Sequence, residues 1–68
     1  MTDPILTEMR LIRLASGRSQ QEVADAAGVV QSSLSYWEQG ARTVPLEKLR
    51  RVLDVLGLDL VIVEKEQP

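Results

Sequence analysis

The residues whose types and spacing indicate a chemical task lie between positions 31 and 37. Leu34 and Trp37 stand three residues apart, so both fall on one face of a helix and the polar residues fall on the other. That second face is polar but nearly uncharged, which suits hydrogen bonding to the edges of DNA bases. In order of preference, the residues that we expect to contact bases are Gln31, Ser32, Ser35 and Tyr36.

Composition excludes several other kinds of chemistry. The 68 residues include no cysteine and no histidine, so disulfides, thiol chemistry, zinc fingers and imidazole catalysis are ruled out together. No plausible nucleophile has a base beside it, and the acidic residues show no paired arrangement. We therefore expect no enzyme, no metal site and no cofactor.

Two short helices must position this polar face. Ser19 and Glu22 form the S-x-x-E pattern of a capping box, so a helix should begin at Gln20. Gly28 ends that helix, because a residue without Cβ adopts the left-handed conformation at little cost. The second helix follows too closely for a long loop, which is the signature of a helix-turn-helix. The small apolar face of the first helix consists of Val23, Ala24 and Ala27.

This stretch resembles the helix-turn-helix of the lambda-repressor-like (Cro-type, XRE) DNA-binding family. The resemblance spans most of the chain and implies a mostly α fold of four helices. We expect residues 1–68 to form a single domain. It rests on Ser19-Gln20, Glu22-Val23-Ala24, Gly28-Val29, Leu34-Ser35 and Trp37-Glu38-x-Gly40.

The resemblance also implies roles for particular residues. Arg13 matches the helix-one arginine that pairs with the glutamate at the end of the recognition helix, here Glu38. Val30 departs from the family, which usually offers a hydroxyl or amide cap at that position. Gln20 matches a position that meets phosphate. The full set that we expect to contact phosphates is Gln20, Arg18, Arg42 and Thr43.

Charge and hydropathy fit a DNA-binding protein of the cytoplasm. The formal net charge is −2, yet Arg10 to Arg51 holds seven basic residues against four acidic ones. A locally positive centre favours salt-sensitive binding to phosphates. No apolar run approaches the roughly 18 residues of a membrane span, and the N-terminus lacks the basic region of a signal peptide. We therefore expect a cytoplasmic location and no membrane partner.

Two further helices complete the predicted domain. The first runs from Pro4 to about Ser16, and the last opens at Pro45 and runs to about Leu56. On the first helix, the residues expected to face the core are Ile5, Met9 and Ile12. The leucines that fall off that stripe are either surface residues or part of a subunit contact, and they are Leu6, Leu11 and Leu14.

The tail from position 58 to 64 changes character. Consecutive β-branched residues and apolar alternation predict a β-strand, and no other part of the chain predicts a second one. A lone apolar edge is an aggregation hazard, so we expect it to pair with the same strand of a second copy. The expected dimer residues are Leu58, Leu60, Val61, Ile62 and Val63. This tail resembles the HipB-type antitoxin branch of the family, whose members dimerise through such strands and repress their own operons.

Two functions follow from these observations. The first is a sequence-specific transcriptional regulator, an autorepressor that binds a palindromic operator as a homodimer. The second is an antitoxin or anti-repressor module whose main task is to bind and neutralise a partner protein. The sequence does not separate them, and the operator, the partner, any inducer and the direction of regulation are left open.

Overall fold

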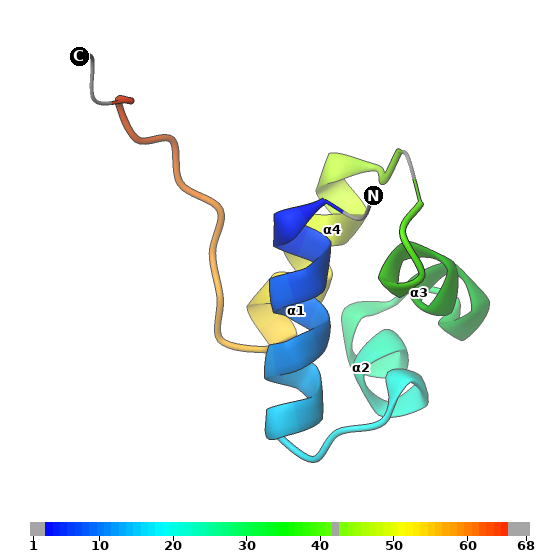
Figure 1. Ribbon diagram of the computed structural model, residues 1–68. Coiled ribbons are helices and arrows are strands. Elements are labelled where there is room, and N and C mark those ends of the chain that lie inside the picture. Colours follow the sequence, from blue (N-terminus) through cyan, green and yellow to red (C-terminus); the bar gives the residue numbers. More distant parts are fainter. Residues whose placement is uncertain (1–2, 42, 66–68) are drawn as a thin grey trace.

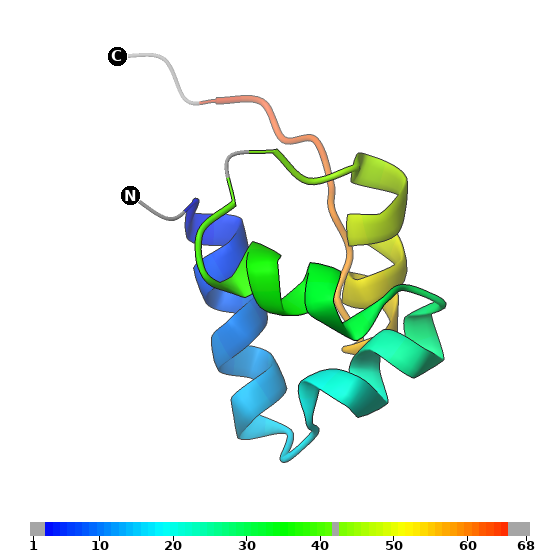
Figure 2. The same ribbon diagram turned by 90° about the vertical axis from the view of Figure 1, so that its right-hand side faces the viewer.

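The computed structural model describes residues 3–41 and 43–65 and contains four α-helices there (Figures 1 and 2). They are α1 (Pro4–Ala15), α2 (Gln20–Ala27), α3 (Gln31–Glu38) and α4 (Leu46–Val55). The predicted helical domain and its helix-turn-helix are thus confirmed. No helix among the described residues is long and apolar enough to cross a membrane.

Local sequence signals account for the helix ends. The Asp3 carboxylate accepts a hydrogen bond from the Ile5 N–H at 2.8 Å, ahead of Pro4, which needs no donor there. At α2 the capping box is complete. The Glu22 N–H donates to the Ser19 hydroxyl at 3.0 Å, and the Ser19 N–H donates to the Glu22 carboxylate at 3.1 Å. Gly28 ends α2 at φ +71°, the left-handed conformation expected of it.

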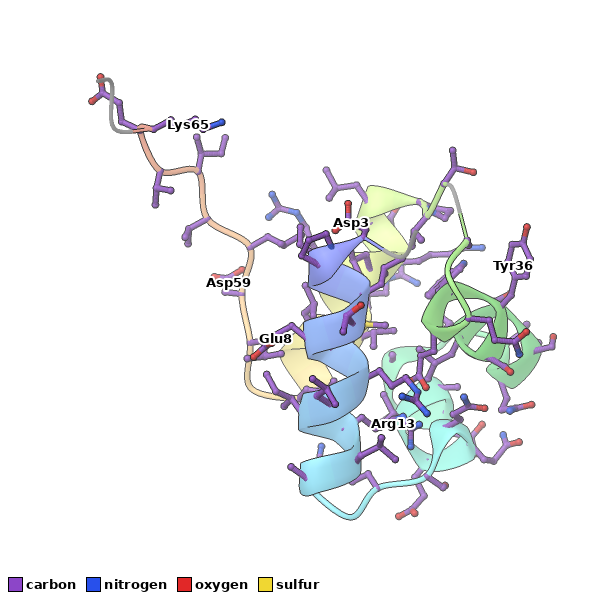
Figure 3. The ribbon with its side chains drawn as sticks, in the orientation of Figure 1. Asp3, Glu8, Arg13, Tyr36, Asp59 and Lys65 are labelled. Carbon is purple, nitrogen blue, oxygen red and sulfur yellow. The ribbon has the colours of Figure 1, made fainter. Side chains whose placement is uncertain are left out.

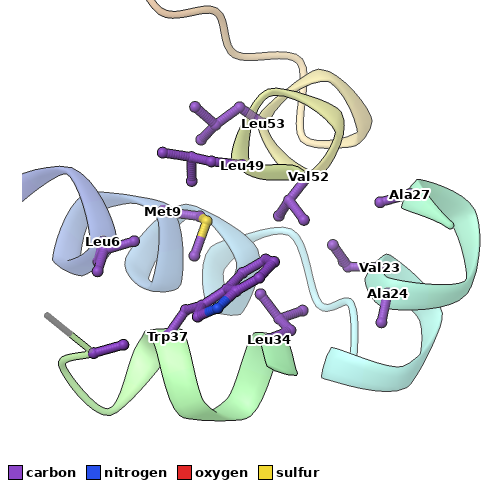
Figure 4. Packing of buried hydrophobic residues seen from close by; sticks show 11 residues of the cluster. Leu6, Met9, Val23, Ala24, Ala27, Leu34, Trp37, Leu49, Val52 and Leu53 are labelled. Atoms are coloured by element: carbon purple, nitrogen blue, oxygen red, sulfur yellow. The ribbon is translucent and has the colours of Figure 1, made fainter. Parts of the chain in front are cut away.

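The core lies where all four helices converge (Figure 4). Met9, Val23, Leu34 and Val52, one from each helix, are fully buried, and Trp37 packs among them. Each fully buried side chain of this kind stabilises the fold by about 1.5–3 kcal/mol. Because α2 and α3 each contribute core residues, the angle between them is fixed by packing rather than by the short turn alone.

The buried stripe of α1 differs from the predicted one. Leu6 is in the core, whereas Ile5 is exposed and Ile12 is only half-buried. The buried positions are Leu6, Met9 and Arg13, which follow a helical face at intervals of three and four. The sequence prediction was right for Met9 but wrong for Ile5 and Ile12, because it counted apolar residues alone and left out the buried arginine. Leu6 is therefore unavailable for a subunit contact, while Leu11 and Leu14 are exposed.

The tail after Gly57 is extended but forms no strand within this single chain. Residues 58–65 have no regular secondary structure, and their one backbone-to-backbone hydrogen bond among the described residues runs from Leu58 N–H to Leu53 O. The tail passes beside α1 and then stands away from the helices (Figure 1). A strand requires a partner strand for its backbone groups, so the predicted strand and its pairing stay a prediction.

Candidate nucleic-acid interface

The helix-turn-helix presents one face of α3 to solvent. A turn of three residues, 28–30, joins α2 to α3, and Leu34 and Trp37 turn inward from α3. Ser32 and Tyr36 are exposed on the opposite side, and Figure 3 shows Tyr36 pointing away from the body of the protein. Gln31 and Ser35 are half-buried at the edge of that face. The structure therefore brings the four expected base-contacting residues onto one accessible side of α3.

A buried ion pair ties α1 to the end of α3. Arg13 Nε donates to Glu38 Oε2 at 2.7 Å, and Arg13 Nη2 donates to Glu38 Oε1 at 2.8 Å. The third guanidinium nitrogen, Nη1, donates to the Arg18 carbonyl at 2.8 Å. The arginine is thus bound to the end of α3 and to the loop before α2, as a planar fork permits. The structure brings together the two residues that the family resemblance paired.

Glu38 also begins a network of hydrogen bonds that reaches Gln31 at the start of α3. Gln20 Nε2 donates to Glu38 Oε1 at 3.0 Å, and Gln31 Nε2 donates to Gln20 Oε1 at 2.8 Å. A carboxylate only accepts hydrogen bonds, so Gln20 must turn its nitrogen toward Glu38 and its oxygen toward Gln31. Gln31 must then offer nitrogen to Gln20. Its amide oxygen and its second N–H make no hydrogen bond among the described residues.

The charges and hydrogen bonds of this network keep Glu38 ionised. Burial by itself raises the pKa of Glu38, but the hydrogen bonds from Arg13 and Gln20 and the nearby positive charges of Arg13 and Arg10 outweigh it. The net result is a pKa below the ordinary value of 4.5. The hydrogen bond to Glu38 correspondingly raises the pKa of Arg13, against the effect of burial. Arg13 and Glu38 are both charged at neutral pH, and in this state every hydrogen bond of the network can form.

The expected phosphate-contacting residues have different surroundings. The amide of Gln20 is engaged by Glu38 and Gln31, which leaves its backbone N–H at the start of α2 as the group suited to a phosphate. Arg18 Nη1 donates to the Val55 carbonyl at 2.6 Å, so this arginine caps the end of α4. Thr43 is exposed, and Arg42 lies outside the described residues. The capping role of Arg18 was not predicted, because only the tertiary fold brings positions 18 and 55 together.

The start of α3 lacks a side-chain cap. Val30 occupies the N-cap position with φ −77° and ψ +134°, and no side chain bonds the first backbone N–H groups of the helix. The backbone conformation is nevertheless the one that capping residues adopt. The helix start therefore keeps donors that a phosphate or a substituted side chain can satisfy.

Taken together, a short turn, a solvent-facing α3 and a hydrogen-bonded glutamine at its start define the DNA-binding helix-turn-helix class. A family described as "Helix-turn-helix domain" matches residues 6–64. The chain therefore belongs to this helix-turn-helix family, of the XRE or Cro-like type, as the sequence resemblance predicted. The family binds DNA to regulate transcription.

Solved structures agree with the fold assignment. The chain is similar to a protein named "MDT Protein", with a TM-score of 0.85 and 24% sequence identity over 97% of this chain and 96% of that one. At that identity the likeness shows a shared fold and no more. No curated protein sequence matches the chain.

Proposed function

We propose that this chain is a sequence-specific transcriptional regulator that inserts α3 into the DNA major groove and reads bases with Gln31. The observation that carries the proposal is the chain of hydrogen bonds from Arg13 through Glu38 and Gln20 to Gln31. It fixes a glutamine side chain at the leading end of an exposed helix. A long polar side chain otherwise loses rotamer freedom on binding, and here much of that loss has already occurred in folding.

The fixed orientation of Gln31 predicts which base it reads. The amide oxygen is an acceptor and the second N–H is a donor, and together they match the N6 amino group and N7 of adenine in the major groove. Ser32, Ser35 and Tyr36 add hydrogen-bonding groups along the same face. These shorter or more mobile contacts adjust the preference at neighbouring base pairs.

Phosphate contacts surround this reading helix in the proposal. The backbone N–H groups at the starts of α2 and α3 are suited to phosphate oxygens, as are Thr43 and the cations Arg18 and Arg42. These groups lie in the segment from Arg10 to Arg51, in which basic residues outnumber acidic ones. Replacing Arg42 by Ala should weaken cognate and unrelated DNA alike and should shallow the salt dependence by about one unit of slope.

We further propose that two copies bind together through their tails. A dimer places two α3 helices in successive major grooves about 34 Å apart on a palindromic operator. Residues 58–64 supply the pairing edge, because within the described residues only two of their backbone N–H groups are bonded, that of Leu58 to Leu53 O and that of Leu60 to the Asp59 carboxylate. An autorepressor of this kind binds the promoter of its own gene.

Selection from a random pool of DNA duplexes tests the proposed function. The expected result is enrichment of an inverted repeat with half-site centres about 10 base pairs apart and an adenine in each half-site that depends on Gln31. Selection by the Gln31→Ala protein should relax the preference at that adenine alone. Failure of the wild-type protein to enrich any sequence would refute the proposal.

A second function, a module that neutralises a partner protein, has one observation in its favour. Leu11 and Leu14 are large apolar residues that are exposed on the surface of α1. Purification from the host with the chain as bait, compared with retention on its own promoter, separates the two functions. A stoichiometric protein partner together with no promoter retention would favour this second function.

A further inference from the structure

An apolar groove beside the tail is the feature that the DNA-binding surface does not use. It has a volume of about 400 Å³ and runs between α1 and the tail. Ile5, Met9 and Ile12 line it from α1, Leu53 from α4, and Leu58 and Leu60 from the tail itself. Figure 3 shows Glu8 of α1 and Asp59 of the tail at its rim. The groove is much larger than one aliphatic side chain, so it has room for an added one.

The tail next to this groove exposes its own apolar side chains. In the single chain, Val61 is 72% exposed, Ile62 is 100% exposed and Val63 is 76% exposed. Within the part of the chain that the structure describes, residues 59–65 make no backbone-to-backbone hydrogen bond. An unpaired extended backbone beside an apolar groove is suited to a second extended segment, which would pair with the backbone and place alternate side chains in the groove.

We infer that the groove of one copy receives Ile62 of a second copy. This inference rests on the proposed dimer and specifies its register. Side chains along an extended segment alternate between two sides, so Ile62 lies on the same side as Leu58 and Leu60, which line the groove. In an antiparallel pair, directly opposed residues also point to the same side. Opposing Leu60 with Ile62 of the second copy therefore directs that isoleucine into the groove.

Neighbouring registers fit the structure less well. In the proposed register Val61 opposes its own copy on the two-fold axis, and residues 58–64 all pair. A shift by two residues in one direction opposes Glu64 with Leu60, which lines the apolar groove alone, whereas the proposed register opposes Glu64 with Leu58, which also borders the pocket of Arg50 and Arg51. A shift in the other direction leaves only residues 58–62 paired, because Gly57 has φ +76° and cannot extend the strand. A shift by one residue moves the side chains to the wrong side of the ribbon.

Charges at the ends of the ribbon complement this register. Lys65 of the second copy lies diagonally across from Asp59, within the reach of a cross-strand pair. Glu64 of the second copy lies opposite Leu58. That leucine borders a pocket that is also lined by Arg50 and Arg51, together with Asp54 and Asp59. Lys65 thus meets a residue of opposite charge, and Glu64 lies beside a pocket that holds two arginines and two aspartates.

Two measurements without DNA test the inference. The first is the dimer dissociation constant of Ile62→Ser by sedimentation. Ile62 makes no buried contact in the single chain, so the variant should keep the wild-type melting behaviour of the monomer. Its dimer should be weaker by about a hundredfold or more, because two buried isoleucines are lost per dimer. Leu46→Ser, at another exposed apolar residue at the start of α4, is the control and should dimerise like wild type.

The second measurement is disulfide formation by single cysteines in a chain that otherwise has none. Val61→Cys should oxidise to a covalent dimer, since the two positions face each other on the axis. Val63→Cys should not, because the two positions lie about 13 Å apart along the ribbon, beyond the roughly 7 Å limit of a disulfide. Equal oxidation of both, or an Ile62→Ser dimer as tight as wild type, would overturn the inference. If the Ile62→Ser dimer is as tight as wild type and still binds the operator, the proposed DNA-binding function stands and only the proposed contact of Ile62 with the groove is refuted. A monomeric wild-type protein would refute both the proposed dimer and this contact.

Discussion

Removing either member of the Arg13–Glu38 pair should cost a large part of the stability of this protein. The side chains of Arg13 and Glu38 are 8% and 2% exposed, and Arg13 Nε lies 2.7 Å from Glu38 Oε2. Because water barely reaches either group, each charge is stabilised mainly by the other. Loss of one partner of such a pair costs on the order of 3–5 kcal/mol. A chain of this size has a total free energy of unfolding of roughly 3–10 kcal/mol.

The variants Glu38→Gln and Arg13→Met separate the two sides of the pair. Glu38→Gln keeps the shape and an oxygen for Gln20 but leaves the Arg13 charge buried without its counterion. We expect its melting temperature to fall by about 12 °C or more, at roughly 4–8 °C per kcal/mol for a domain of this size. Far-UV circular dichroism during thermal and urea unfolding measures the change. In the double variant no buried charge remains unpaired, so its loss should be smaller than the sum of the single losses by about 1–3 kcal/mol.

The exposed pair of Arg51 and Glu47 is a matched control. Its nitrogen and oxygen lie 2.6 Å apart, yet the two side chains are 51% and 79% exposed. Solvent screening should limit the effect of Glu47→Gln to about 0.5 kcal/mol. Glu38→Gln and Glu47→Gln with equal effects would refute the reasoning, since it attributes the difference to burial and not to distance.

Three further predictions concern pH and the helix starts. Folding lowers the pKa of Glu38, so the ionised carboxylate stabilises the folded protein above the ordinary pKa of 4.5. This stabilisation should be lost as the pH falls through the lower pKa of the folded state. Measuring the free energy of unfolding at decreasing pH should show the loss in wild type and a smaller loss in Glu38→Gln. Val30→Asp should stabilise the protein by about 1 kcal/mol, because the backbone at position 30 already has the capping conformation, and an unchanged urea midpoint would contradict this. Ser19→Ala should destabilise by about 1 kcal/mol through loss of the α2 cap, whereas Ser19→Asp should retain most of the stability.

Much of the fold is predictable because its signals are local. The capping box at Ser19, the terminating Gly28 and the inward spacing of Leu34 and Trp37 each depend on neighbours within four residues. The error on α1 has the opposite origin. Arg13 belongs to the buried stripe only because Glu38, 25 residues later, supplies its counterion, and apolar periodicity carries no information about such a partner.

The family resemblance predicts the Arg13–Glu38 pair, whereas the other hydrogen bonds between the candidate site residues are not predictable from the sequence. Gln20 and Gln31 were assigned to phosphate and base separately, whereas the structure joins them by a hydrogen bond of 2.8 Å. Arg18 was assigned to phosphate, and the structure shows it bonded to the end of α4. Contacts between segments so distant in sequence depend on how the helices cross, which a single sequence does not specify.

The most direct measurement of the central claim compares Gln31→Ala with Gln39→Ala on cognate and scrambled DNA. Both substitutions remove a glutamine side chain, but from opposite ends of α3. Gln31 begins the helix, whereas Gln39 follows its end and its side chain bonds only to Ser35 among the described side chains. Loss of the contact between Gln31 and its base should weaken cognate binding by about 5- to 150-fold, corresponding to 1–3 kcal/mol, and should leave scrambled binding unchanged. Gln39→Ala should bind both like wild type. Equal loss on cognate and scrambled DNA for Gln31→Ala would contradict the assignment of Gln31 as the residue that reads sequence.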